Sequence, residues 1–220
     1  MKKYYLHFLF VAAAISLAAC APKEGSYPID KAVYDRLPFE MEEVQLPTFP
    51  DYKVSIVEFG AIGDGVALNT KAINEAIAHV NAKGGGTVVI PEGLWLTGPI
   101  EMKSNVNLHT EYNALVYFSG DHSLYPIIET SFEGLDTRRC QSPISAWNCE
   151  NIAITGHGTF DGNGDTWRVV KKSKVTENQW KNFLKRGGVV EGTNWYPSEG
   201  SLKGKNACIS FNNPVGIETE

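Results

Sequence analysis

The apolar positions between residues 59 and 99 follow first a helical and then a strand pattern. Five apolar residues recur at spacings of three and four, which places them on one face of an amphipathic helix: Ala72, Ile73, Ala76, Ile77 and Val80. Asn69 precedes them and is expected to cap the first turn through its side chain. Gly84 follows, where a left-handed conformation can end a helix. The pattern therefore predicts a helix over residues 70–83.

After this helix the pattern changes to that of short strands. Residues 87–90 are β-branched and apolar, and the Pro-Glu-Gly turn at 91–93 separates them from a new strand at 94–97. The sequence contains no second long amphipathic helix, so alternating strand–helix units of an open sheet are excluded. One early helix and many short strands predict an all-β fold, a right-handed parallel β-helix whose N-terminal end is covered by the single helix.

A loose repeat supports this solenoid. Residues 104–109 are echoed by residues 150–155, each with asparagine, an aliphatic residue, a small or polar residue and another aliphatic residue. Asn105 and Asn151 are 46 positions apart, which would correspond to two coils of roughly 20 to 25 residues each. We interpret these two asparagines as turn or stacking residues.

Residues 57–100 resemble the N-terminal segment of pectin-degrading β-helix enzymes. The resemblance rests on Phe-Gly-Ala-x-Gly-Asp-Gly at 59–65, Asn-Thr at 69–70, the two Ala-Ile pairs, Gly-Gly-Gly-Thr-Val at 84–88, Pro-x-Gly at 91–93 and Thr-Gly-Pro-Ile at 97–100. The order is most similar to that of glycoside hydrolase family 28, the polygalacturonases, and other pectate-lyase-like β-helices share this segment. The resemblance implies a pectate-lyase-like solenoid and, as the leading activity, inverting hydrolysis of α-1,4-galacturonide bonds in pectic polysaccharide or oligogalacturonides.

The first twenty residues have the pattern of an export signal. Lys2 and Lys3 precede a short apolar core at 8–17, and Leu-Ala-Ala-Cys at 17–20 resembles a lipobox with Cys20 as the acylated residue. An ordinary secretory peptide is the alternative. We favour a lipoprotein of the Gram-negative outer membrane, because the two residues after Cys20 carry no acidic retention signal. The expected organisation is a signal peptide at 1–20, a tether rich in proline and charge at 21–52, and an apparently truncated N-terminal part of a β-helix domain at 53–220.

Net charge and cysteine content add little to the prediction of function. A formal net charge of −5 gives no indication of nucleic acid binding, and an acidic enzyme can still place basic residues at its cleft. Cys140, Cys149 and Cys208 remain beside Cys20. One disulfide is possible, most plausibly between Cys140 and Cys149, although sequence cannot establish the pairing.

The Gly-His-Gly triplet at 156–158 matches a catalytic triplet of the family, but it lies upstream of the place where the other catalytic motifs would begin. We therefore interpret His157 as a turn or rim residue. Asp161 is expected to be a turn aspartate that accepts hydrogen bonds from nearby N–H groups.

Residues 167–188 read as an insertion between coils. A Thr-x-x-Gln capping box at 176–179 predicts a helix of two to three turns, with Gly187 at its end. This is the most basic stretch of the chain, either a solvated surface or a rim for galacturonate carboxylates. The candidate substrate-binding residues are two arginines, which match carboxylates bidentately, one stacking tryptophan and two lysines: Arg138, Arg139, Trp167, Lys171 and Lys172. No cofactor or metal is expected.

The catalytic motifs of the family, Asn-Thr-Asp, Asp-Asp, a later Gly-His-Gly and Arg-Ile-Lys, do not occur in the sequence. Inverting hydrolysis needs an acid and a base carboxyl group roughly 6.5 to 9.5 Å apart. We therefore expect a polygalacturonase-like chain without the catalytic coils, inactive by itself. Two alternatives stay open: a calcium-dependent β-helix enzyme such as a pectate lyase or uronate epimerase, for which no carboxylate cluster is visible, and a non-catalytic carbohydrate-binding surface protein.

Overall fold

The computed structural model describes residues 34–42, 46–132, 134–203 and 209–212. The chain divides into two compact units, Met1–Val44 and Gln45–Glu220, and every described helix and strand belongs to the second. The predicted signal peptide, including Cys20, lies outside the described residues. No helix in the described part of the chain is long and apolar enough to cross a bilayer.

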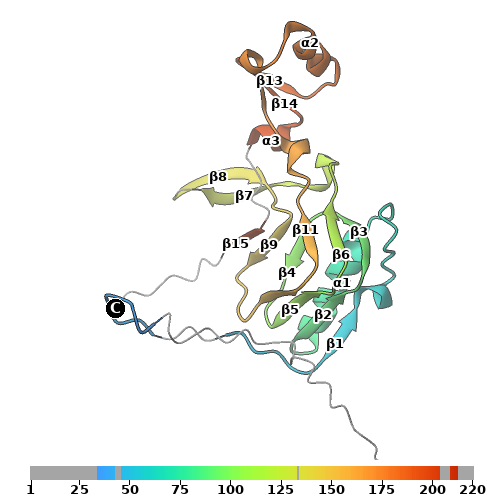
Figure 1. Cartoon of the computed structure of the whole chain (residues 1–220), viewed down its shortest axis with the longest axis vertical. Coiled ribbons are helices and arrows are strands. Elements are labelled where there is room, and N and C mark those ends of the chain that lie inside the picture. The colour runs from blue at the N-terminus through green and yellow to red at the C-terminus, as the bar shows by residue number, and fades with distance from the viewer. Residues whose placement is uncertain (1–33, 43–45, 133, 204–208, 213–220) are drawn as a thin grey trace, which may run out of the picture. The chain divides into compact units, whose positions relative to one another are not determined.

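Three parallel sheets build the coils of the second unit (Figure 1). The first contains β1 (Lys53–Ser55), β2 (Gly86–Ile90), β5 (Val106–Thr110) and β10 (Ala153–Gly156). The second contains β3 (Gly93–Thr97), β6 (Ala114–Phe118) and β11 (Thr159–Asp161), and the third contains β4 (Ile100–Met102), β9 (Ile144–Trp147) and β15 (Ile209–Asn212). The chain visits the three sheets in turn and then starts the next coil, so all pairings within these sheets are parallel. The prediction of an all-β fold with parallel sheets is confirmed.

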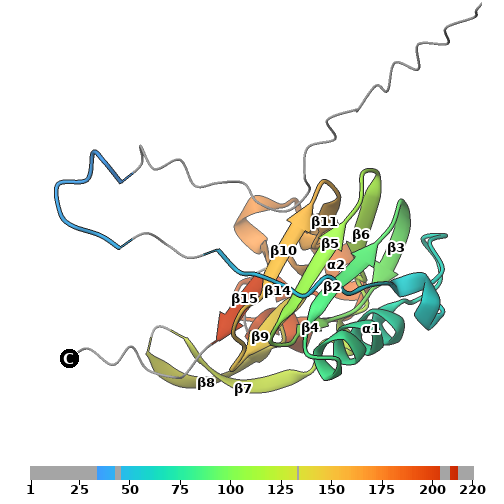
Figure 2. The same cartoon turned by 90° about the horizontal axis from the view of Figure 1, so that it is seen from below.

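The core consists of the inward side chains of successive coils. In the first sheet Val88 pairs with Leu108 and Leu108 pairs with Ile154, so that side chains of one kind stack on one another. Figure 2 shows β2, β5 and β10 side by side. In the second sheet Trp95 pairs with Val116, and both are buried. This stacking removes apolar surface from water in every coil and fixes the register of the strands.

The interpretation of the 46-residue offset as two coils is wrong. β10 pairs directly with β5, with Ala153 opposite Asn107, so the offset spans one coil. The extra length is a hairpin of β7 (Ile127–Phe132) and β8 (Leu135–Cys140), inserted between β6 and β9 after the short helix η3 (His122–Leu124). Asn151 Nδ2 donates to Asn105 Oδ1 at 2.9 Å across the two coils, which confirms these asparagines as stacking residues.

A second, longer insertion separates β11 from β15. Its described elements are η4 (Gly164–Trp167), β12 (Val170–Lys171), η5 (Lys172–Lys174), α2 (Glu177–Lys185), β13 (Val189–Glu191), β14 (Asn194–Tyr196) and α3 (Glu199–Lys203). Strands β12, β14 and β13 form an antiparallel sheet. The capping box of Thr176 and Gln179 begins α2 as predicted. Helix α2 was thus predicted for this insertion, whereas α3 was not.

Helix α1 (Thr70–Ala82) agrees with the predicted 70–83, and its five predicted apolar residues are buried. It packs against β1, β2, β4, β5 and the short helix η2 (Ile56–Phe59). Gly84 has a φ of 92°, the left-handed conformation expected after the helix. The predicted side-chain cap by Asn69 is wrong. Asn69 is only 2% exposed, and its amide group instead bonds the backbone of Ile62, Ala67 and Leu96.

The last part of the predicted tether contacts the coils. Thr48 N donates to Asn151 Oδ1 at 3.1 Å, and Asn151 Nδ2 donates to Thr48 O at 2.8 Å. Farther along, Thr87 N donates to Tyr52 O, which joins the segment to the first coil. The expected disulfide between Cys140 and Cys149 is not formed, because Cys149 is a free thiol whose Sγ lies 3.3 Å from Met102 O.

Candidate functional site

Both insertions leave the coils at the same corner, between the second and third sheets. The first, residues 119–143, connects β6 to β9, and the second, residues 162–208, connects β11 to β15. Because β11 pairs with β6 and β15 pairs with β9, the two insertions start and end side by side. We call their described residues the insertion corner. All five candidate substrate-binding residues lie on it.

His122 connects the two insertions. Its ring stacks on Trp167 with centroids 3.6 Å apart and planes 16° apart, and Tyr125 meets the same indole edge-on at 5.1 Å. His122 Nδ1 lies 2.6 Å from Ser198 Oγ, and that oxygen also accepts from Ser201 N at 3.1 Å. Ser198 Oγ therefore contacts both the imidazole of His122 and the backbone N–H of Ser201, and the imidazole tautomer determines which of Ser198 Oγ and His122 Nδ1 donates the bond between them.

Burial lowers the pKa of His122, and the nearby carboxylate of Asp121 partly opposes this shift. The pKa of Asp121 is itself lowered, first by the hydroxyl of Ser123 and then by the backbone N–H of Ser123, so this carboxylate stays ionised near neutral pH. His122 Nε2 is buried and has no hydrogen-bond partner among the described atoms. The lowered pKa makes the neutral imidazole the main form of His122 at pH 7.

The contact between the insertions is closely packed. Ser201 Oγ donates to Trp167 O at 2.7 Å, and α3 contacts β8. A Cβ atom placed on Gly200 would lie 3.1 Å from Cys140 Sγ and 3.5 Å from the Trp167 ring. Glycine at this position therefore lets the second insertion approach the hairpin of the first.

The two candidate arginines lie next to each other on β8. Arg138 pairs with Glu129 across the hairpin and is exposed, whereas Arg139 pairs with Ile128 and is half-buried. Trp167 contacts Tyr125, which lies two residues before the first strand of this hairpin, and one face of the Trp167 ring is covered by His122. The structure thus brings Trp167 to the insertion that carries both arginines.

The two candidate lysines lie in the second insertion, where β12 meets η5. Lys171 ends β12 and Lys172 begins η5, and both are exposed. Lys172 Nζ lies 3.6 Å from Glu177 Oε1. Trp195, on β14, is buried against Phe183 and donates from Nε1 to Gly187 O at 2.7 Å, so it packs within the insertion.

The interpretation of His157 and Asp161 is confirmed. His157 is exposed at the turn between β10 and β11, and its ring stacks on Tyr112 with centroids 4.1 Å apart. Asp161 Oδ1 accepts from Asn163 N at 2.8 Å. Within the described ranges no group of three or more histidine, cysteine or acidic residues is placed to hold a metal ion.

Sequence reasoning missed His122 and Ser198. They are 76 residues apart and lie in different insertions, where no repeat constrains their position. Each residue alone is common in a loop, so the sequence carries no signal that pairs them.

Comparisons with known proteins agree with this architecture. Residues 53–142 match the family model described as rhamnogalacturonase A/epimerase, pectate lyase-like. The chain is 35% identical over 125 residues to the "Probable polygalacturonase" of Vitis vinifera, covering 53% of this chain and 26% of that protein. It is 29% identical over 161 residues to the exo-poly-alpha-D-galacturonosidase of Dickeya chrysanthemi, covering 70% of this chain and 25% of that protein.

Among solved structures, the hyperthermoactive exopolygalacturonase of Thermotoga maritima matches with a TM-score of 0.54 and 33% sequence identity, over 68% of this chain and 37% of that one. The chain spans about a quarter of the length of the two curated relatives. The resemblance to polygalacturonases is thereby confirmed for the part of them that the chain covers.

Proposed function

We propose that this chain, a homologue of polygalacturonases, has the function of a glycoside hydrolase that degrades pectin. We further propose that its coils and insertions bind the galacturonan chain. The match to the exopolygalacturonase of Thermotoga maritima carries the proposal, because sequence identity and fold agree over the same 68% of this chain. The reaction we propose is inverting hydrolysis of α-1,4-galacturonide bonds. Since the sequence lacks the catalytic motifs of the family, the described coils receive a binding role rather than the bond-cleaving one.

The insertion corner supplies the proposed contacts. Arg138 and Arg139 can present guanidinium forks to galacturonate carboxylates, which match this geometry bidentately. Lys171 and Lys172 add exposed positive charge on the second insertion. Trp167 would contact a sugar ring only through surface that His122 leaves uncovered.

Helix α1 has the proposed role of covering the end of the solenoid at the first coil. Its apolar face packs on β1, β2 and β4. Thr70 Oγ1 accepts from Gly98 N at 2.6 Å, and Asn74 bonds Pro99 O and Glu101 N. These contacts satisfy backbone groups at the sheet edge that water would otherwise reach.

We also propose that Cys20 is lipidated and anchors the protein to the outer membrane of a Gram-negative bacterium. The support is the lipobox-like sequence at 17–20. Replacing Cys20 by Ser should abolish labelling with a palmitate analogue and release the protein from membranes. A wild-type protein that is unlabelled and released from cells without a membrane fraction would contradict the anchor.

The test of the main proposal uses polygalacturonate and two readouts. The 220-residue chain, and the chain extended by any in-frame sequence that follows codon 220, are incubated with the polymer while reducing ends and the absorbance of unsaturated products are followed. We expect both proteins to bind the polymer and only the extended chain to release reducing ends. Unsaturated products would indicate a lyase, and binding without cleavage by the extended chain would indicate a carbohydrate-binding surface protein.

A further inference from the structure

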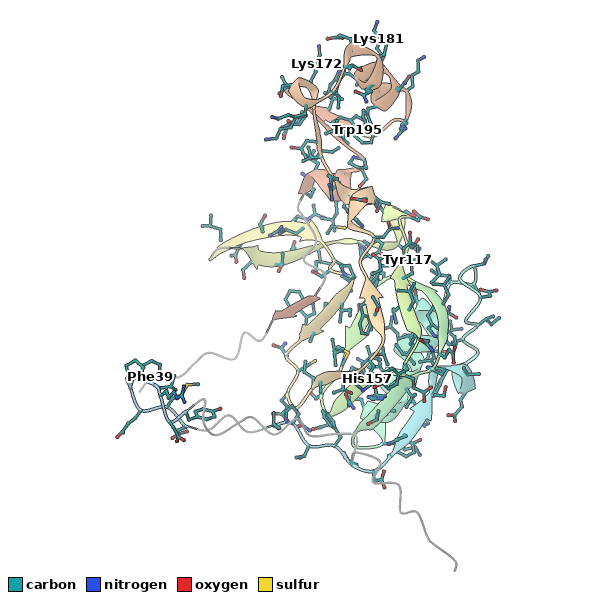
Figure 3. The ribbon with its side chains drawn as sticks, viewed as in Figure 1. Phe39, Tyr117, His157, Lys172, Lys181 and Trp195 are labelled. Carbon is teal, nitrogen blue, oxygen red and sulfur yellow. The ribbon has the colours of Figure 1, made fainter. Side chains whose placement is uncertain are left out.

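The part of the second insertion between residues 168 and 196, which we call the basic module, has its own small core. Trp180 and Trp195 are only 7% and 6% exposed, and the Phe183 ring lies 4.9 Å from the Trp195 ring. The capping box of Thr176 begins α2, and the antiparallel sheet of β12, β14 and β13 supports it. The side chains on this module are therefore carried by an ordered frame (Figure 3).

The charges on the basic module are strongly unbalanced. The module contains seven lysines and arginines, all within residues 168–186, and two acidic residues, Glu177 and Glu191, in a chain whose formal net charge is −5. Two of the seven are neutralised by ion pairs, Arg168 with Asp165 at 2.7 Å and Lys172 with Glu177 at 3.6 Å. Four exposed lysines form no ion pair within the described part of the chain: Lys171, Lys174, Lys181 and Lys185. A concentration of one sign of charge attracts a polyanion over a distance of about a Debye length, roughly 10 Å at 0.1 M salt.

The exposed groups of the basic module indicate what kind of ligand it can bind. The tryptophan rings of the module are buried, so they cannot stack on bases as in proteins that bind single-stranded nucleic acid. Arg186 lies over the Phe183 ring at 5.0 Å and Arg168 is paired with Asp165, so the exposed charges that have no ion pair or ring contact among the described residues are lysine ammonium groups. Ammonium groups act as point charges without bidentate geometry. Such a surface suits a polymer that repeats a single negative charge, and it tolerates sliding along that polymer.

We propose that Lys174, Lys181 and Lys185 form a docking surface for acidic polysaccharide, separate from the arginines of the hairpin. The inference rests on the proposed function, since pectic galacturonan is the polyanion which that function supplies. Lys181 and Lys185 are four residues apart on α2 and therefore lie on one face of the helix. Lys174 lies two residues before the N-cap Thr176. The surface retains the polymer through several weak contacts.

The experiment compares two triple variants of the full chain in binding to polygalacturonate. K174Q/K181Q/K185Q removes the docking surface, and K53Q/K83Q/K103Q removes the same charge from three exposed lysines outside the two insertions. At 50 mM salt we expect the first variant to bind about tenfold more weakly and to show a shallower dependence on salt, and the second to stay within about twofold of wild type. Equal melting temperatures establish that both variants are folded.

Three other outcomes would each contradict the inference. If both triple variants bind like wild type, the inference is overturned while the proposed function stands. If the lysines instead govern binding to phosphatidylglycerol vesicles and leave polygalacturonate binding unchanged, the surface docks on membranes and the inference is likewise overturned. If wild type binds no polygalacturonate, the inference fails, and sugar release by the extended chain decides independently whether the proposed function fails with it.

Discussion

Asn151 lies directly over Asn105 of the preceding coil, and its Nδ2 donates to Asn105 Oδ1 at 2.9 Å. Both residues have a positive φ, 51° and 63°, a conformation that asparagine adopts more readily than most residues. Asn151 also exchanges two hydrogen bonds with the backbone of Thr48. One side chain therefore joins the corners of two coils to the segment that precedes the first strand.

Replacing Asn151 by Ala should destabilise the coils by about 1–3 kcal/mol, because three hydrogen bonds at a partly exposed site are lost and a left-handed residue gains a Cβ without an amide. Chemical denaturation measures this change. The control is Asn151→Gly, which loses the same hydrogen bonds but adopts the left-handed conformation freely. It should be less destabilised than the alanine variant, and the reverse order would contradict the backbone part of the argument.

The sequence predicted those parts of the fold that are encoded locally. The apolar spacing at Ile73 and Ile77 predicted α1, and the capping box at Thr176 predicted α2, because both signals lie within a few residues of the structure they specify. The cap by Asn69 was predicted wrongly, since its buried amide is surrounded by backbone groups of the preceding loop, at Ile62 and Ala67, and of Leu96 on β3, and bonds to those instead. At Asn69, tertiary contacts and not local propensity determine the hydrogen bonds of the side chain.

The length of a coil could not be predicted in the same way. From β2 to β5 the pairing offset is 20 residues, with Val88 opposite Leu108, but from β5 to β10 it is 46, with Leu108 opposite Ile154. The apolar pattern of the strands repeats from coil to coil because their side chains share one core. An insertion at the corner adds residues to a coil without changing the strands or this core. The contact of His122 with Ser198 could not be predicted for the same reason. It depends on two insertions whose lengths are independent, so no sequence repeat relates the two residues.

Gly156→Ala should prevent normal stacking of the third coil. The residue has a φ of 99°, and a Cβ atom there would lie 1.9 Å from the carbonyl oxygen of Thr110. Backbone cannot move aside as a flexible side chain can, so we expect a loss of at least about 3 kcal/mol in unfolding free energy, or failure to fold.

The matched control is Gly164→Ala in the same stretch of sequence, where no atom lies within 4 Å of the added Cβ. Its stability should be unchanged or raised by up to about 1 kcal/mol. Denaturant titration of the two variants under one condition makes the comparison. Similar values for both would show that the close approach at Thr110 is not rigid.

Ile73→Ala tests the packing of α1 on the coils. Ile73 is fully buried among residues of the first coil, and its truncation should cost about 2–5 kcal/mol, since a cavity remains where the side chain packed. Val66→Ala, at a position 79% exposed, should change stability by less than about 0.5 kcal/mol. A small loss at Ile73, measured by the same denaturant titration, would contradict a covering role for α1.

Acid should weaken the contact between the two insertions through His122. Burial lowers the pKa of this imidazole in the folded protein below its ordinary value of 6.5. A base whose pKa is lowered by folding contributes stability that is fully present above the ordinary pKa and is lost as the pH falls through the folded value. Asp121 moderates the loss from the same short helix, and the groups that contact the ring from other elements, Trp167 and Ser198, bring no charge.

The measurement is the melting temperature of wild type and two variants between pH 8 and pH 4.5. His122→Gln keeps a side chain that can hydrogen-bond Ser198 but does not titrate, so it should be less stable at pH 7 and show a flatter dependence on pH than wild type. Asp121→Asn removes the opposing carboxylate, so the pKa of His122 should fall further and the loss of stability in acid should become larger. Parallel pH curves for wild type and His122→Gln would show that another group governs the acid response, and a flatter curve for Asp121→Asn would contradict the assigned sign.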